Sequence, residues 1–152
     1  INFPNIYFVH RDFHSRNLMF IDRNTGPGII DFQDAVNGPI TYDLVSLLKD
    51  AYYELEEDMV IDLLVRHWEK LKEANLIKSN DFSDFYKSFE WMGVQRHMKI
   101  LGIFVRLSIR DGKDQYLEDI NLVEKYLIGA TKRYSELFPL RNILMKAMES
   151  HG

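Results

Sequence analysis

The sequence predicts an α+β fold that is mainly helical and carries a small β-hairpin. Two observations support this prediction. β-branched and aromatic runs, bounded by turn-forming residues, are confined to residues 6–30. From Leu44 onward, apolar residues recur at helical spacing. Strands followed by an unbroken series of helices are typical of an α+β lobe.

The strands are expected at residues 6–9, 18–21 and 29–30. A polar loop, His10–Asn17, separates the first two, and the turn formers Asp22–Gly28 separate the second from the third. We interpret these runs as a hairpin with one polar loop at its start and another at its end.

Five helices are expected after the Gly38-Pro39 break. Their apolar faces fall at residues 44–52, 60–71, 82–89, 120–134 and 140–148, and the third helix is expected to run on beyond Met98. Asp43 lies in the first turn of the first helix, where a negative charge is favourable against the helix dipole. The 152 residues suit a single domain with its own core.

Composition excludes several classes of partner. The formal net charge of −4 favours neither nucleic acid nor an anionic membrane. No apolar run approaches the roughly 18–20 residues that span a bilayer. The absence of cysteine excludes disulfides and thiolate metal sites and fits a reducing cytoplasm.

The densest chemical signal is the loop between the first two strands. Asp12 and Asn17 lie five residues apart in it, and Asp31 follows the third strand. A carboxylate that takes the proton of an attacking hydroxyl, with an amide oxygen and a second carboxylate on Mg²⁺, is what phosphoryl transfer requires.

These residues resemble the catalytic and metal-binding loops of the protein-kinase-like fold. Three features depart from protein kinases: His14 stands two residues after Asp12, Gln33 replaces the glycine after Asp-Phe, and Gly38–Leu44 follows with no long activation segment. This version resembles the aminoglycoside phosphotransferases and their relatives, which phosphorylate small hydroxylated molecules.

Longer stretches are similar to bacterial cell-wall-recycling sugar kinases, which phosphorylate N-acetylmuramate and N-acetylglucosamine at the anomeric hydroxyl. They cover residues 9–19, 30–50 and 91–113. The resemblance implies ATP and Mg²⁺ as cofactors, a small sugar as substrate, a bacterial cytoplasmic location and a role in peptidoglycan recycling.

The resemblance also implies roles for individual residues. Asp12 would be the catalytic base, and Asn17 and Asp31 would hold Mg²⁺. Asp43 would be a buried brace that accepts backbone N–H bonds from the catalytic loop. His10 is expected to tie the loop to the hairpin, whereas His14 either orders the loop or lies near the substrate.

Other polar residues leave two interpretations open. Arg11 and Arg16 are either solvated or bind a phosphate or a substrate carboxylate. Asp34 is a candidate substrate-facing group. Basic residues follow residue 95 at helical spacing, so that their charges lie close together. They form either a solvated face or part of a substrate pocket. The pocket candidates there are Gln95, Arg96 and Arg106.

The sequence shows neither a glycine-rich phosphate loop nor the strand lysine with its helical glutamate partner. We therefore expect residues 1–152 to be the C-terminal catalytic and substrate lobe. The nucleotide-clamping N-terminal lobe would be absent from this chain, which alone would be inactive. The alternatives are a kinase of aminoglycosides or other small molecules and, in another class, a non-catalytic pseudokinase-like binding module.

Overall fold

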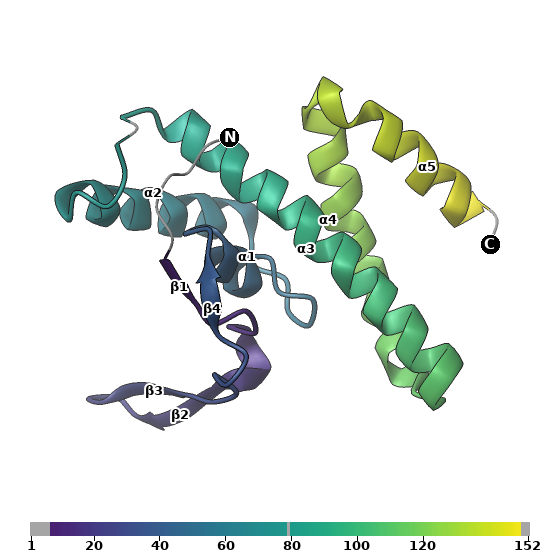
Figure 1. The fold of residues 1–152 in the computed structure, drawn as a ribbon, viewed down its shortest axis with the longest axis horizontal. Coiled ribbons are helices and arrows are strands. Elements are labelled where there is room, and N and C mark those ends of the chain that lie inside the picture. The colour runs from purple at the N-terminus through teal and green to yellow at the C-terminus, as the bar shows by residue number, and fades with distance from the viewer. Residues whose placement is uncertain (1–6, 79, 150–152) are drawn as a thin grey trace. The chain divides into compact units, whose positions relative to one another are not determined.

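The computed structural model describes residues 7–78 and 80–149, which divide into two compact units, Ile1–Met92 and Gly93–Gly152. Helices dominate both units, and the strands are short and confined to the first (Figure 1). This confirms the predicted fold class. The division falls between Met92 and Gly93, within one long helix.

The strands form two separate antiparallel pairs. They are β1 (Tyr7–Val9), β2 (Leu18–Asp22), β3 (Gly26–Ile29) and β4 (Val36–Gly38). β2 and β3 make the predicted hairpin, whereas β1 pairs with β4. The prediction missed β4 because Val-Asn-Gly has little β-propensity and no alternation. Of the first predicted strand, Ile6 lies outside the described residues.

The hairpin turn lies earlier than predicted. Arg23, Asn24 and Thr25 occupy the turn, while Gly26, Pro27 and Gly28 belong to β3. Asp22 Oδ1 accepts the backbone amides of Asn24 at 2.7 Å and Thr25 at 2.9 Å. These bonds, that of Asn24 first, lower the pKa of Asp22. An Asp side chain therefore closes the turn, and Gly26 follows it at a φ of 74°.

The core of the first unit lies between its helices. These are α1 (Tyr42–Leu48), α2 (Glu57–Glu73) and the first part of α3 (Phe82–Asp111). Val45, Leu64 and Phe89 are at most 1% exposed and belong to one apolar cluster. α1 ends earlier than predicted, because the Tyr52 amide bonds to the Asp50 side chain in an Asx-type turn. The core thus holds α1 under the loop between β1 and β2.

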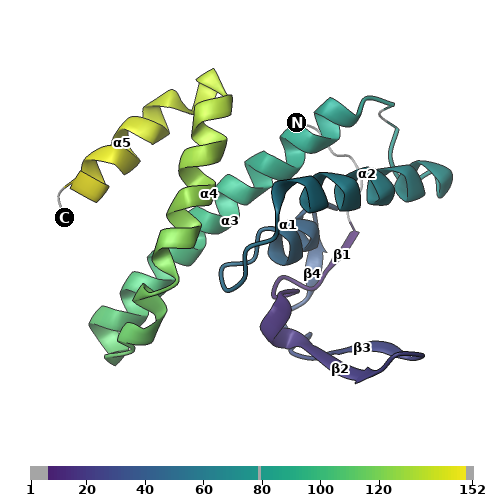
Figure 2. The same cartoon turned by 180° about the vertical axis from the view of Figure 1, so that it is seen from behind.

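In the second unit, the regular elements of residues 93–149 are all helices. After the remainder of α3 come η2 (Asp114–Leu117), α4 (Ile120–Arg133), η3 (Ser135–Leu137) and α5 (Phe138–Glu149), with α4 running back along α3 (Figure 2). His97 stacks on Tyr126, with ring centroids 5.0 Å apart. Within the described residues, no helix is long and apolar enough to cross a membrane.

Adjacent leucines on α2 test this core. Leu64 is fully buried and Leu63 is 39% exposed. Leu64→Ala is expected to lower the free energy of unfolding by about 2–5 kcal/mol, because it removes buried apolar contacts and leaves a cavity. Leu63→Ala should cost clearly less. Urea denaturation measures both, and equal losses would contradict this placement of the core.

Candidate active site

The loop between β1 and β2 is held at its start by one carboxylate. Asp43 Oδ2 accepts the backbone amide of His10 at 2.7 Å, and Asp43 Oδ1 accepts that of Arg11 at 3.0 Å. Because Asp43 lies in the first turn of α1, the packed helix fixes where the loop begins. Both oxygens are therefore engaged with backbone rather than directed at a substrate.

The loop backbone is strained next to Asp12. Arg11 has a φ of 76°, which is unfavourable for a non-glycine residue. Ser46 on α1 donates its hydroxyl to the Tyr42 carbonyl at 3.1 Å and, more weakly, to the Arg11 carbonyl at 3.5 Å. Such conformations cost about 1–3 kcal/mol and persist where surrounding bonds impose them, often at functional sites.

Asn17 connects the loop to the segment after β3. Its Nδ2 donates to the Asp12 carbonyl at 2.9 Å and lies 3.4 Å from Asp31 Oδ2. A carbonyl only accepts hydrogen bonds, so the amide nitrogen must face it. The Asn17 Oδ1 oxygen is then the atom left to serve as a ligand.

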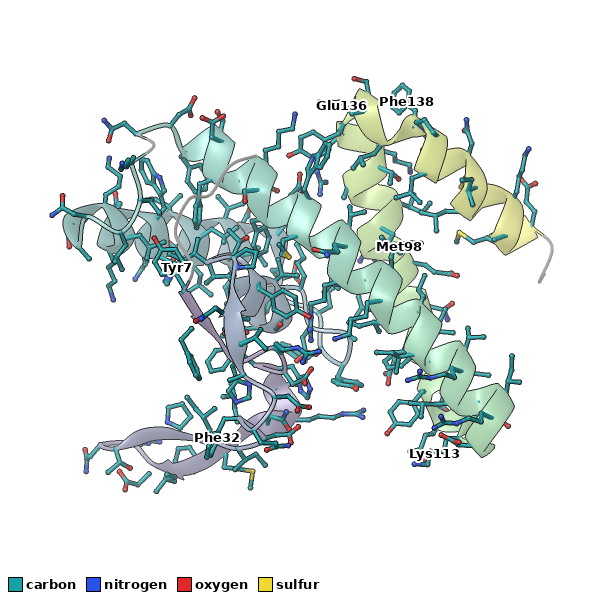
Figure 3. All side chains as sticks on the ribbon, viewed as in Figure 1. Tyr7, Phe32, Met98, Lys113, Glu136 and Phe138 are labelled. Atoms are coloured by element: carbon teal, nitrogen blue, oxygen red, sulfur yellow. The ribbon has the colours of Figure 1, made fainter. Side chains whose placement is uncertain are left out.

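Asp31 is positioned by its own segment. Its φ is 65°, and its Oδ1 accepts a hydrogen bond from Gln33 Nε2 at 2.5 Å. Phe32 between them is 65% exposed beside the hairpin (Figure 3). Gln33, which replaces the glycine of protein kinases, thus orients the carboxylate whose other oxygen lies 3.4 Å from Asn17 Nδ2.

The Asn17–Asp31 pair fits magnesium in a specific way. No group of three His, Cys, Asp or Glu side chains in the described residues is placed to hold a metal. A closed protein cage is therefore not built here. One amide oxygen and one carboxylate instead match an ion that takes its other ligands from water and phosphates.

The two histidines of the loop have different surroundings. His10 is 4% exposed, makes an edge contact with Phe13, and has no hydrogen-bond partner for its ring among the described residues. His14 lies edge-on to Tyr52, with ring centroids 5.4 Å apart. His10 therefore contributes to the loop by packing, and His14 contacts an aromatic side chain beyond α1.

The remaining predicted residues are dispersed. Asp34 is exposed, and its carbonyl accepts a bond from Arg11 Nη1 at 3.4 Å. Gln95, Arg96 and Arg106 lie on α3 in the second unit, outside the unit that holds the catalytic loop. Arg96 is buried, whereas Gln95 and Arg106 are exposed. Their substrate-binding role stays a prediction.

Sequence reasoning missed a second carboxylate that holds the loop. Asp50 is 3% exposed, and its Oδ2 accepts the backbone amide of Ser15 at 2.8 Å. A usable signal was present, because Asp50 follows an apolar helix and stands seven residues, about two helical turns, after Asp43. Tyr52 and Gln33 were also overlooked, since their roles depend on contacts that no sequence pattern encodes.

Comparison with known proteins identifies relatives of this chain. Residues 4–76 match the phosphotransferase enzyme family. The N-acetylmuramate/N-acetylglucosamine kinase of Neisseria meningitidis is 53% identical over 94% of this chain and 42% of its own length. The enzyme of the same name in Pseudomonas aeruginosa is 45% identical over 90% of this chain and 40% of its own. The chain therefore spans about two fifths of these relatives.

Removing the Asp43 brace should loosen the loop. Asp43→Asn keeps the side-chain volume but places an NH₂ group against one of the two backbone N–H donors. The hydrogen bond lost there is worth about 1–3 kcal/mol. Hydrogen exchange at the amides of residues 10 and 11 should be roughly ten times faster. Asp58→Asn, an exposed change on α2, is the matched control. Unchanged exchange in Asp43→Asn would disprove the brace.

Proposed function

We infer that the full-length protein transfers the γ-phosphoryl group of ATP to a sugar hydroxyl, and the match of residues 4–76 to the phosphotransferase enzyme family supports this. One observation carries this inference. A braced loop presents Asp12, and Asn17 from the same loop reaches Asp31, the predicted second metal ligand. A base and a metal pair in this relation are what direct phosphoryl transfer uses.

Asp12 is the proposed catalytic base. It orients the acceptor hydroxyl and takes its proton as the new bond to phosphorus forms. The Asn17 bond to the Asp12 carbonyl and the Asp43 bonds just before it limit movement of the Asp12 backbone. Positioning is a large part of catalysis where no covalent enzyme intermediate is required.

Asn17 and Asp31 are the proposed ligands of Mg²⁺. Bound there, the metal would offset negative charge on the nucleotide phosphates. Gln33 holds one oxygen of Asp31, and the Asn17 amide directs its own oxygen away from Asp12. His10 and His14 support this arrangement by packing around the loop.

The proposed acceptor is an N-acetylated amino sugar, N-acetylmuramate or N-acetylglucosamine, phosphorylated at its anomeric hydroxyl. The support comes from the names of relatives that are 45–53% identical to the chain. These relatives are bacterial, which supports a role in peptidoglycan recycling in a bacterial cytoplasm. An aminoglycoside is the weaker alternative, because a polycation would require a pocket lined by carboxylates.

We propose that the nucleotide is clamped by a lobe outside this chain. The sequence lacks a glycine-rich phosphate loop and the strand lysine. The chain also covers 42% of the Neisseria relative. The residues here would then supply the base, the metal ligands and part of the acceptor site, and activity would require the full-length protein.

Asp12→Asn in the full-length protein tests the base. Loss of a general base should lower kcat by about 10²–10⁴-fold and change the KM for ATP little. Phosphate transfer is measured on N-acetylmuramate, N-acetylglucosamine and an aminoglycoside panel, with Asp58→Asn as the control. Activity on aminoglycosides alone would keep the mechanism and exclude the proposed sugar. Full activity in Asp12→Asn would exclude this base.

Metal dependence tests Asp31 and Gln33 separately. Chelation of the metal should abolish transfer, and Asp31→Asn should raise the Mg²⁺ concentration for half-maximal activity more than tenfold. Gln33→Ala removes only the bond that orients Asp31, so an increase of about tenfold is expected. Initial rates of phosphate transfer at varied Mg²⁺ concentration and fixed ATP provide the measurement. Unchanged values for both variants would remove Asp31 from the metal site.

A further inference from the structure

Tyr52 forms a platform under the second half of the catalytic loop. The Arg16 guanidinium carbon lies 3.5 Å from the centroid of the Tyr52 ring, and the His14 ring meets the same ring edge-on at 5.4 Å. The residues on both sides of Ser15 therefore rest on one aromatic side chain. A 3.5 Å separation is van der Waals contact, so the guanidinium lies against the ring face.

Asp50 holds this platform and the loop together. Its Oδ2 accepts the Ser15 amide at 2.8 Å, and its Oδ1 accepts the Tyr52 amide at 3.1 Å. One buried carboxylate thus fixes the backbone beneath both members of the Arg16–Tyr52 stack. The arginine is pre-organised, and less side-chain entropy is lost when it binds a ligand.

The chemistry of a stacked arginine suits a carboxylate. Stacking occupies the face of the guanidinium, while its N–H groups lie at the edges of the plane. Arg16 is exposed. A guanidinium carries five N–H donors, so one of its edges can bind the two oxygens of a carboxylate with two parallel hydrogen bonds while other donors keep partners within the protein.

Arg16 is also close to the proposed reaction centre along the chain. It directly precedes Asn17 and stands four residues after Asp12, a separation that spans at most about 14 Å when extended. The 3₁₀ turn η1 (Ser15–Asn17), closed by the bond from the Asn17 amide to the His14 carbonyl at 2.9 Å, shortens that path. A sugar ring with one side arm, together with an arginine side chain, can bridge this distance.

We propose that Arg16, stacked on Tyr52 and held through Asp50, binds the carboxylate of an acidic acceptor sugar. The inference rests on the proposed sugar-kinase function and adds a residue that recognises one substrate. N-acetylmuramate carries a carboxylate on its lactyl arm, and N-acetylglucosamine does not. Arg16 would therefore contribute to binding of the first sugar and not of the second.

A structural role for the stack makes a different prediction. If Arg16 only stiffens the loop, its loss affects Asp12 and lowers kcat for both sugars equally. If it binds the carboxylate, the loss falls on KM for N-acetylmuramate alone. The ratio of the two specificity constants separates these cases.

The experiment compares Arg16→Gln with wild type in the full-length protein on both sugars. We expect KM for N-acetylmuramate to rise about tenfold or more, as for loss of a charge-assisted bidentate pair, and KM for N-acetylglucosamine to stay within twofold. Arg66→Gln is the matched charge control, because Arg66 is an exposed residue of α2 with a 70% exposed side chain. Arg106→Gln is measured alongside it.

An uncharged substrate analogue, combined with the Arg16→Gln variant, tests whether the arginine and the carboxylate interact directly. The carboxamide of N-acetylmuramate keeps the lactyl arm without its charge, so wild type should bind it about as weakly as Arg16→Gln binds the acid. Arg16→Gln should change its KM little, and this non-additivity assigns the interaction to the pair. Tyr52→Phe should keep the selectivity, whereas Tyr52→Leu should lose part of it.

The outcomes are distinct. A selective rise in KM for the acid supports the inference. Equal losses on both sugars, or a selective loss in Arg106→Gln instead of Arg16→Gln, overturn it and leave the sugar-kinase function standing. A wild-type protein that phosphorylates N-acetylglucosamine but not N-acetylmuramate also overturns it. A wild-type protein that phosphorylates neither sugar overturns both proposals.

Discussion

Backbone amides bound to two carboxylates, the partly buried Asp43 and the buried Asp50, are the interaction on which the site depends. Asp43 takes the amides of His10 and Arg11, and Asp50 takes that of Ser15. An ionised acceptor makes these bonds stronger than neutral ones, and burial reduces competition from water. Asp12 is therefore held in a loop that is attached at both ends to α1 and its exit, and α1 in turn is fixed by the apolar core.

Hydrogen bonds to carboxylates also accompany the two strained residues of the candidate site. Arg11 and Asp31 both have positive φ. Arg11 directly precedes the proposed base Asp12, and Asp31 is itself a proposed metal ligand. Asp43 opposes relaxation at Arg11, and Gln33 bonds to the Asp31 side chain. Free energy from core packing and hydrogen bonds is thus partly offset by strain beside the proposed base and at a proposed metal ligand.

The sequence predicted the fold class and the polar loops of the candidate site, but it missed some of the elements around them. Asp12, Asn17 and Asp31 were named from local chemistry and spacing, and their roles stay proposals. β4 was not, because Val-Asn-Gly becomes a strand only through its pairing with β1. Gly26–Gly28 resembled a turn in composition, yet the Asp22 side chain places the turn earlier. Asp50 and Tyr52 depend on contacts across 35 or more residues, which periodicity and motif spacing do not report.

The position of both carboxylates along one short segment limits how the chain can change length. α1 has seven residues, and Asp43 and Asp50 lie at its first turn and just beyond its end. Deleting one residue between them would rotate everything that follows by about 100° and draw it back by about 1.5 Å. Asp50 would then point away from Ser15 while Asp43 stayed in place. An insertion or deletion within residues 44–49 would therefore separate the two ends of the loop between β1 and β2.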